Sequence, residues 1–174
     1  MSQPDRKTAL IQALTNHVLA EGLGAASLRP LAKAVGTSDR MLLYYFPDKP
    51  ALISAVLEEV AGRMKAMLEF QRSAEPVTTS ELETRLLPLL HDPNVWPYMQ
   101  VWLEMAALAA RGDETCARVG GAIARGFVDW LGSQIAVPED QRRGAAVRLL
   151  ATIEGAVLLT SLGLGTEIAG LAKA

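Results

Sequence analysis

Residues 27–49 limit the possible folds of this chain more than any other segment, because they contain two short helical patterns separated by one glycine. Ser27 and Ser38 are suitable N-caps for the two helices, and Gly36 ends the first of them. Pro47 ends the second, since the residue before a proline is disfavoured in the α region. With a connection of about three or four residues, the two helices must cross steeply. The segment therefore predicts a helix-turn-helix.

The second helix of this pair has an outer face that is polar and aromatic rather than apolar. Ala32, Val35 and Leu42 are placed to pack where the two helices cross. The side chains left on the outer face are Ser38, Arg40, Met41, Tyr44 and Tyr45. A helix of this length fits the major groove of DNA, where its N-terminal residues meet base edges. The face therefore favours a nucleic-acid interface, although two tyrosines beside Phe46 would also suit a helix end in an ordinary core.

The rest of the chain also predicts helices, because apolar residues recur at three- and four-residue spacing without sustained alternation. Helices are expected at about 4–21, 49–73, 81–90, 98–110, 114–135 and 139–162, with a short turn of helix at 93–97 and a short helix after Gly165. We therefore expect an all-α fold of about nine helices. The expected domains are 1–48 and 49–174.

Composition and charge limit the class of protein. Apolar residues make up 50% of the 174-residue chain, which excludes a disordered chain. The formal net charge is −2, but residues 1–49 hold six Lys/Arg and four Asp/Glu, a net +2, which leaves −4 for residues 50–174. Cys116 is the single cysteine, so no internal disulfide can form, and a reduced cytoplasmic setting fits.

The apolar pattern does not favour a membrane protein. Residues 1–8 are polar and no apolar run follows them early in the chain, so a signal peptide is not indicated. The most apolar stretch, 144–171, is interrupted by Arg148, Glu154 and Glu167. A helix buried on several sides is therefore favoured over a membrane span.

The residues of the 27–49 segment agree in type and spacing with a known pattern. That pattern is a leucine–alanine pair, a glycine, a small or apolar residue, a serine, and a short helix closing in two aromatics, phenylalanine and, three residues later, lysine. Here these residues are Leu31, Ala32, Gly36, Thr37, Ser38, Tyr44, Tyr45, Phe46 and Lys49. Over residues 5–57 the chain resembles the DNA-binding domain of the tetracycline-repressor (TetR) family of bacterial regulators. The rest resembles that family only in its helix order.

The resemblance implies an N-terminal three-helix DNA-binding domain with a helix-turn-helix, followed by a helical domain for effector binding and dimerisation. It implies that Lys49 and Tyr45 contact phosphates, and that Tyr44 contacts a phosphate or a base edge. Arg40 and Met41 would face the groove, and Arg40 would read sequence, since arginine can pair with guanine O6 and N7. The predicted DNA-binding set is completed by Ser27, Arg29, Thr37 and Ser38.

The second domain contains methionines and tryptophans that suit an adaptable apolar pocket. The predicted effector-binding set, taken from helix order in the family, is Met64, Met67, Leu86, Trp96, Met99, Trp102, Leu103 and Phe127. Gln100, Glu104 and the indole N–H groups are the few polar candidates. The resemblance therefore implies a small apolar or lightly polar effector, whereas an ordinary helical core would account for the same residues.

Small residues on the last two long helices favour a dimer interface, because glycine and alanine let helices approach closely in a bundle shared by two subunits. The predicted interface set is Gly121, Val128, Ala146, Leu150, Ile153 and Val157. We therefore expect a homodimer whose partners are a near-palindromic operator in double-stranded DNA and a small-molecule effector of unknown identity.

Nothing in the sequence predicts an enzyme, a cofactor or a metal site. His17 and His91 are the only histidines, and neither has metal-ligand spacing with Cys116 or with a carboxylate pair. No nucleophile, base and orienting group come together, and no glycine-rich loop is placed to hold a phosphate.

Two functions are open at this point. The first is a ligand-responsive transcriptional regulator, a repressor by family habit. The second is a helical small-molecule-binding or interaction module without specific DNA binding. Leu43 and Asp39 favour the second slightly, because Leu43 stands where the family usually has tyrosine and Asp39 would repel phosphate. A shared exposed face for the predicted DNA contacts would distinguish the two.

Overall fold

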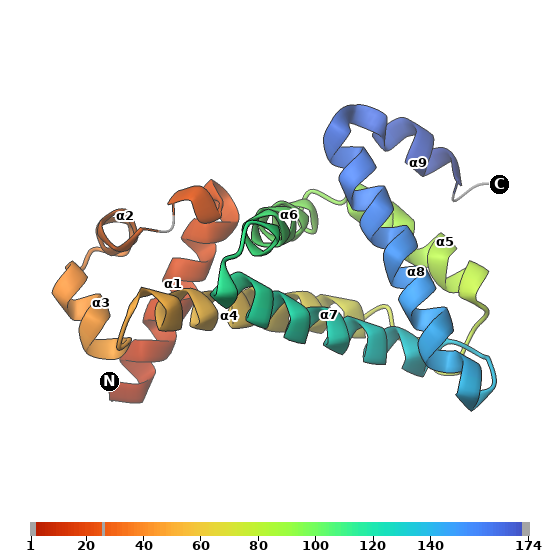
Figure 1. Cartoon of the computed structure of the whole chain (residues 1–174), viewed down its shortest axis with the longest axis horizontal. Coiled ribbons are helices and arrows are strands. Elements are labelled where there is room, and N and C mark those ends of the chain that lie inside the picture. Colours follow the sequence, from red (N-terminus) through yellow and green to blue (C-terminus); the bar gives the residue numbers. More distant parts are fainter. Residues whose placement is uncertain (1–2, 26, 172–174) are drawn as a thin grey trace. The chain divides into compact units, whose positions relative to one another are not determined.

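The computed structural model describes residues 3–25 and 27–171, and in that part of the chain the regular elements are helices (Figure 1). They are α1 (Gln3–Glu21), η1 (Leu23–Ala25), α2 (Leu28–Ala34), α3 (Asp39–Tyr45), α4 (Lys49–Glu69), α5 (Thr79–Leu86), η2 (Leu87–His91), α6 (Trp96–Ala110), α7 (Glu114–Gln134), α8 (Glu139–Leu159), η3 (Thr160–Leu164) and α9 (Gly165–Leu171). One isolated backbone bridge pairs Val77 with Ile135. The predicted all-α fold is confirmed.

Packing divides the chain into two compact units. The first consists of Met1–Lys65 and Gln100–Gly121, and the second of Ala66–Met99 and Ala122–Ala174. Helices α4, α6 and α7 therefore each supply residues to both units. The predicted domains divide the chain by function instead, and they remain a prediction.

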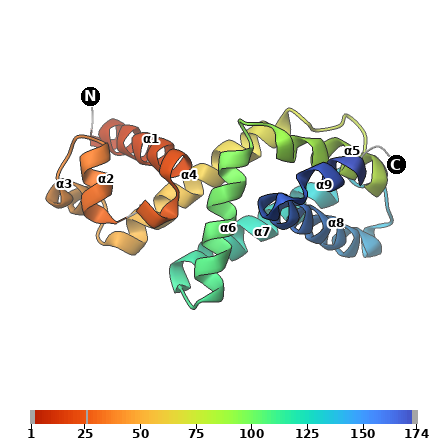
Figure 2. The same ribbon diagram turned by 90° about the horizontal axis from the view of Figure 1, so that it is seen from above.

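The first unit contains the helix-turn-helix, where α1, α2, α3 and the start of α4 lie together (Figure 2). Buried apolar side chains on these helices hold it. Helix α2 contacts both α1 and α3. The fully buried side chains on α1 to α4 include Leu14, Val18, Leu31, Leu42, Leu52 and Val56. Because burying a leucine fully contributes about 1.5–3 kcal/mol, this small core suffices to fix the short helices α2 and α3.

Arg63 ties α4 to α1 within the first unit. Its Nε donates to Glu59 Oε1 at 2.9 Å, one turn earlier on α4. Its Nη1 donates to Asn16 Oδ1 at 2.6 Å, and its Nη2 donates to the carbonyl of Gln12 at 3.3 Å. The guanidinium thus links the polar sides of α1 and α4, whose apolar sides pack in the core of the first unit.

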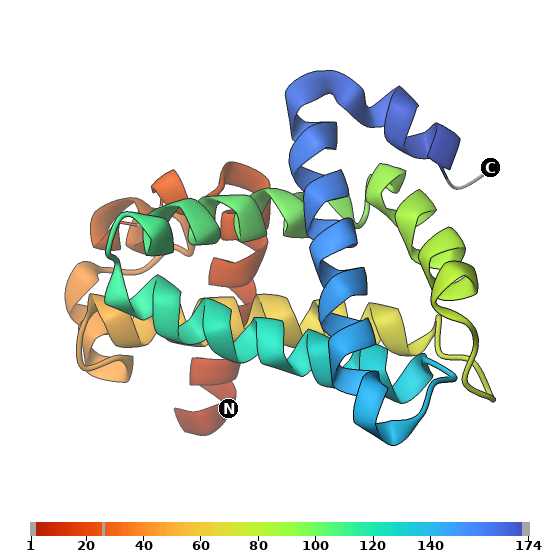
Figure 3. The same cartoon turned by 45° about the vertical axis from the view of Figure 1, so that its right-hand side comes forward.

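The second unit is arranged around α8, as Figure 3 shows. Helix α8 contacts α5 and η2, and α9 contacts both α8 and η2. Between α8 and α9 the chain turns at Gly163, whose φ of +94° lies in the left-handed region that glycine adopts without strain. The side of α8 that packs within the chain consists of Ala145, Ala146, Leu149, Ala156 and Val157.

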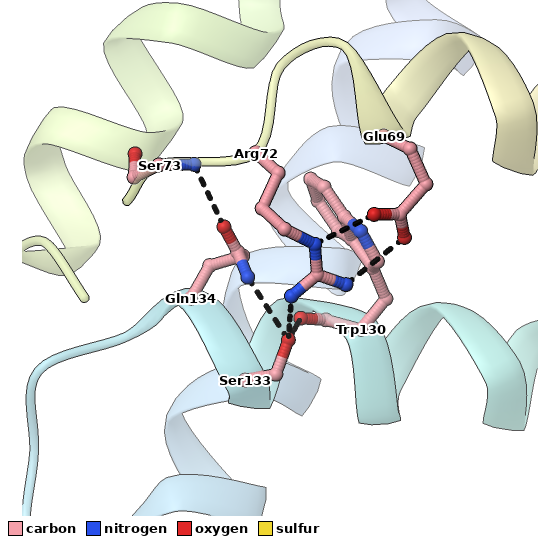
Figure 4. A network of polar contacts seen from close by, with 6 residues as sticks. All are labelled: Glu69, Arg72, Ser73, Trp130, Ser133 and Gln134. Atoms are coloured by element: carbon pink, nitrogen blue, oxygen red, sulfur yellow. Dashed lines mark hydrogen bonds and ion pairs between the residues drawn. The ribbon is translucent and has the colours of Figure 1, made fainter. Parts of the chain in front are cut away.

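A polar cluster anchors the α4–α5 connection against the end of α7 (Figure 4). The Arg72 guanidinium donates to the Glu69 carboxylate at 2.6 and 2.9 Å and to Ser133 Oγ at 3.4 Å. The buried Gln134 accepts from the Ser73 N–H at 3.0 Å and donates to Ser133 Oγ at 3.0 Å. The amide of Gln134 therefore satisfies a backbone group of the connection.

Some helix boundaries differ from the prediction for identifiable reasons. Helix α4 ends at Glu69 rather than near residue 73. Helix α5 begins earlier than predicted because Thr78 and Glu81 form a capping box, in which Thr78 Oγ1 accepts from the Glu81 N–H at 3.2 Å. The α5 helix gives way to a 3-10 helix where Pro88 removes a backbone donor.

Among the described residues, Glu139–Gly170 is long and apolar enough to cross a membrane by length and composition alone. Core helices of water-soluble proteins pass the same test, so the observation is weak. The turn at Gly163 also interrupts this stretch. Several apolar side chains of this stretch are nevertheless exposed, among them Val147, Leu158 and Leu162.

Candidate nucleic-acid interface

The turn between α2 and α3 has the local structure that its sequence predicts, with one exception. Ser38 caps α3, because its Oγ accepts from the Met41 N–H at 3.3 Å. Gly36 has a φ of +67°, and the Thr37 N–H donates to the carbonyl of Ala32 at 2.8 Å. Ser27 occupies the N-cap position of α2 as predicted, but its side chain makes no capping hydrogen bond.

Buried apolar side chains hold α3 against the rest of the first unit. Leu42 is 0% exposed, and Ala32 and Phe46 are each 2% exposed. The Nζ of Lys7 lies 5.1 Å from the centroid of the Phe46 ring, which adds a cation–π contact from α1. Helix α3 is therefore fixed from its inner side, which leaves its outer side for a partner.

The outer side of α3 presents the residues predicted to enter the groove. Arg40 is exposed, Met41 is 42% exposed and Tyr44 is 64% exposed. Arg40 and Tyr44 are four residues apart and so lie on the same face of the helix. Tyr45 is half-buried and makes an edge contact with Tyr44, with ring centroids 5.1 Å apart.

Lys49 is exposed at the first position of α4, near the end of α3. Asp48 caps this helix, since its Oδ1 accepts from the Ala51 N–H at 2.7 Å. The carboxylate of Asp113 accepts from the Cys116 N–H at 2.8 Å, and this bond is the main reason why the pKa of Asp113 lies below its usual range. The positive charge of Lys49 lowers the same pKa further, so the start of α7 brings a carboxylate near the predicted phosphate contact.

The other members of the predicted DNA-binding set lie on α2 and the turn. Ser27, Arg29 and Ser38 are exposed, and Thr37 is half-buried. Asp39, in the first turn of α3, and Leu43 are exposed as well. The first unit thus places the set on the outer sides of α2 and α3 and at the start of α4. Contact with DNA remains a prediction.

The predicted effector-binding residues are divided between the two compact units. Met64, Trp102 and Leu103 belong to the first unit, whereas Met67, Leu86, Trp96, Met99 and Phe127 belong to the second. Leu86 is buried and the other seven are half-buried. These residues therefore remain a predicted set.

Glu104, a polar candidate for the effector pocket, makes a different contact. Its Oε2 accepts from the N–H of Leu23 at 2.6 Å and from the N–H of Gly24 at 3.1 Å. These donors lie in the connection between α1 and α2, about eighty residues away in sequence. Sequence reasoning missed this contact because no local pattern links a helix residue to so distant a backbone.

Three of the six predicted dimer residues are packed inside the chain. Ala146 and Val157 are 0% exposed and Val128 is 8% exposed, so their side chains are not available to a second copy. Gly121, Leu150 and Ile153 are half-buried. The glycine and alanine pattern selected the side of α8 that packs within its own chain, because small residues suit any close helix contact.

A different side of α8 is apolar and exposed. Val147 is 48% exposed, Leu158 is 49% exposed, and Leu162, just beyond the helix, is 69% exposed. At about 100° per residue, Val147, Ala151 and Leu158 fall within a narrow arc of α8, and the half-buried Glu154 lies at its edge. We call these residues and Leu162 the outer α8 face.

The described residues contain no group of three or more His, Cys, Asp and Glu side chains that could hold a metal ion. Cys116 is buried, and burial is the main cause that raises the pKa of its thiol to about 11. The Asp113 carboxylate raises it further. Cys116 is therefore a neutral thiol near pH 7 and behaves as a small core residue.

Comparison with known proteins bears on the same segment. Residues 10–56 match the family model described as bacterial regulatory proteins, tetR family. The chain is similar to the HTH-type transcriptional regulator BetI of Cronobacter sakazakii, with 25% identity over 167 residues. That alignment covers 92% of this chain and 81% of the relative.

Solved structures extend the likeness to the whole fold. A transcriptional regulator from a Rhodococcus strain has a TM-score of 0.75 at 21% identity, covering 98% of this chain and 92% of that one. The regulator FadR from Bacillus subtilis, solved in complex with stearoyl-CoA, has a TM-score of 0.62 at 17% identity, covering 94% of this chain and 95% of that one. At such identities the likeness shows a shared fold.

Proposed function

The chain belongs to the TetR family of bacterial transcriptional regulators, and from that premise we propose that it is a ligand-responsive repressor. In this proposal a cytoplasmic homodimer binds a near-palindromic operator and leaves it when a small apolar effector binds. Two recognition helices about 34–36 Å apart would enter successive major grooves. The effector would favour a conformation with another spacing and so release DNA by population shift.

The observation that carries the DNA-binding part is the contrast between the two sides of α3. Leu42 is 0% exposed on the inner side, whereas Arg40 and Tyr44 share an exposed outer side. A helix fixed from behind can hold its outer side chains at defined positions against base edges. We assign base reading to Arg40, because an arginine can form two hydrogen bonds with guanine.

Lys49 supports the proposal as a contact to the DNA backbone. It is exposed at the start of α4, and its ammonium group can bind a phosphate without reading sequence. Residues 1–49 hold six Lys/Arg and four Asp/Glu, so the number of cationic side chains available for such contacts is small. We therefore expect a modest salt dependence, in which each phosphate contact contributes about −0.9 to the slope of log K against log salt concentration.

A salt-controlled binding experiment tests these roles. Wild-type protein, Arg40→Ala and Lys49→Ala are titrated by fluorescence anisotropy against the DNA upstream of the protein's own gene and against altered sequences. Lys49→Ala should weaken binding to all duplexes alike, and Arg40→Ala should change the preferred sequence by about 1–3 kcal/mol at one position. Lys65→Ala, an exposed lysine further along α4, is the control and should bind as the wild type does.

The results separate the proposal from its rival. Equal loss on every sequence for Arg40→Ala would refute the reading role of this residue. If wild-type protein showed no sequence-preferring, salt-sensitive binding to any duplex, including those selected from a random library, the chain would instead be a helical small-molecule-binding or interaction module.

We assign the dimer contact to the outer α8 face. Val147, Leu158 and Leu162 are exposed together along one side of α8 and just beyond it, and a group of exposed apolar side chains is more often covered by a partner than one that stands alone, as Phe70 does. Leu158→Glu should convert a dimer to a monomer in sedimentation and abolish tight operator binding. Phe70→Glu is the matched control, because Phe70 is 88% exposed outside this face. A Leu158→Glu variant that remains dimeric would remove the face from the interface.

The effector is tested without assuming its identity. A native mass spectrum of the purified protein would reveal a co-purified molecule, and thermal unfolding with fatty acids and stearoyl-CoA would test apolar ligands. Binding at one hundred times Kd should stabilise the protein by about 2.7 kcal/mol. A repressor requires in addition that the same molecule weakens operator binding.

A further inference from the structure

Glu104 joins α6 to the segment that connects the first two helices of the DNA-binding domain. Its Oε2 lies 2.6 Å from the Leu23 nitrogen and 3.1 Å from the Gly24 nitrogen. Both N–H groups therefore donate to one carboxylate oxygen. Hydrogen bonds to an ionised acceptor are roughly twice as strong as those between neutral groups. Among the described contacts of the first unit, this one links α6 directly to the backbone that leads into α2.

The backbone at Gly22 is shaped to admit this carboxylate. Gly22 ends α1, and its N–H donates to the carbonyl of Val18 at 2.8 Å. Its φ is +82°, and a Cβ there would lie 2.5 Å from Glu104 Oε1. Any side chain at position 22 would displace the carboxylate or shift the backbone. Two observations therefore show that the Glu104 carboxylate fits closely against this backbone: the space left by Gly22 and the hydrogen bonds from Leu23 and Gly24. We call this backbone, residues 22–24, the carboxylate seat.

Helix α6 is itself firmly held in the first unit. On either side of Glu104, Val101 is 1% exposed and Met105 is 3% exposed. The same helix carries Trp102 and Leu103, two of the residues predicted to contact the effector. A displacement of α6 would therefore strain or break the hydrogen bonds to Leu23 and Gly24. Both donors are backbone N–H groups, so they cannot follow Glu104 unless the backbone itself moves.

We propose that Glu104 is a positioning residue that holds the α1–α2 connection, and through it the helix-turn-helix, in the DNA-binding conformation. This inference rests on the proposed function, because it assigns to α6 the control of DNA affinity. Loss of the contact leaves α2 and α3 folded but lets them adopt other orientations, so only a fraction of molecules is competent to bind. The apparent Kd rises by the inverse of that fraction.

The test compares variants that break the contact between Glu104 and the carboxylate seat, either at Glu104 or at Gly22. Glu104→Ala removes the acceptor, Glu104→Gln keeps a neutral acceptor, and Gly22→Ala blocks the seat. The control is Gly24→Ala, which keeps its N–H and has no atom within 4 Å of the added Cβ. Each full-length variant is titrated against a duplex that the wild-type protein selects from a random library, and amide exchange at Leu23 and Gly24 is followed in parallel.

We expect Glu104→Ala and Gly22→Ala each to bind about tenfold more weakly, a difference of about 1.4 kcal/mol. Glu104→Gln should lie between Glu104→Ala and the wild type, and Gly24→Ala should bind normally. The double variant at positions 22 and 104 should be no weaker than either single variant, because both changes break one contact. Amide exchange at Leu23 and Gly24 should accelerate in the same order.

Wild-type affinity in both Glu104→Ala and Gly22→Ala would overturn the proposal, and so would fully additive losses in the double variant. If Glu104→Ala fails to fold, Glu104→Gln and Gly22→Ala decide the outcome. A merely structural role predicts lower stability with unchanged affinity among folded molecules. If the wild-type protein selects no duplex, the proposed function fails, whereas normal binding by every variant means that only the role of Glu104 fails.

Discussion

Gly36 provides a direct measure of what the helix-turn-helix requires of its backbone. Its φ is +67°, and no atom lies within 4 Å of the place that a Cβ would occupy. Gly36→Ala therefore introduces no clash, and its penalty is the left-handed conformation, about 1–2 kcal/mol for an L residue. Lower entropy of the unfolded chain offsets this by about 0.4–1 kcal/mol. We expect a net loss of about 1 kcal/mol in the free energy of unfolding.

Urea and thermal unfolding followed by circular dichroism, at one fixed protein concentration, measure this loss. For a chain of this size, 1 kcal/mol corresponds to a fall in Tm of about 2–4 °C. Gly24→Ala is the matched control, because its surroundings are equally open and its φ is outside the left-handed region. Gly36→Asn should lose less than Gly36→Ala, since asparagine tolerates the left-handed region.

Two results would refute this reasoning. Equal stability of Gly36→Ala and the wild type would mean that the turn does not hold residue 36 in the left-handed region. A loss above about 3 kcal/mol would exceed any backbone penalty of this kind and would require a steric conflict. In either case, the stability of Gly36→Ala would contradict the left-handed turn at Gly36 that leads into α3.

Other side chains give equally specific expectations. Asp113→Ala should cost about 0.5–2 kcal/mol at pH 7 through loss of the α7 cap. Because the folded pKa of Asp113 is lowered, its contribution is present above the unfolded value of about 3.9 and is lost as pH falls through the folded pKa, so the urea midpoints of variant and wild type should approach each other as the pH falls below about 3.9. Cys116, with a pKa of about 11, should react with iodoacetamide at pH 8 about a hundredfold more slowly in the native protein than in urea, because the thiolate fraction falls by about that factor. Equal rates in a mass-spectrometric time course would contradict its burial. Gln134→Ala should lower the free energy of unfolding by about 1–3 kcal/mol because it leaves the Ser73 N–H without its acceptor, whereas the exposed Gln141→Ala should change it little.

The helix-turn-helix could be predicted closely because its limits are set by local chemistry. Gly36 supplies a left-handed turn, Ser38 caps the following helix, and Pro47 stops it. Each effect acts within about one turn of helix, so the sequence around it is sufficient. Where a boundary depended on less obvious local chemistry, as at the Thr78–Glu81 capping box, the prediction began α5 two residues late.

The sides of α8 were harder to assign because both are apolar. Helical spacing identifies an apolar side but does not say whether the chain itself or a second copy covers it. Ala146 and Val157 were predicted to meet a partner and are buried within the chain. Exposure in three dimensions, which depends on α5, η2 and α9, shows that the chain itself leaves Leu158 and Leu162 uncovered, and the proposed dimer contact rests on this exposure.

Glu104 illustrates the same difficulty for regulation. Its neighbours Trp102 and Leu103 placed it in a predicted effector pocket, whereas its carboxylate meets the backbone of Leu23 and Gly24. The one sequence signal of this contact is Gly22, which serves equally well as the end of α1. The proposed DNA contacts lie in one continuous segment, whereas the proposed control of DNA binding requires a contact between distant segments. A regulator can therefore keep a recognisable DNA-binding motif while the residues that control it follow no common pattern.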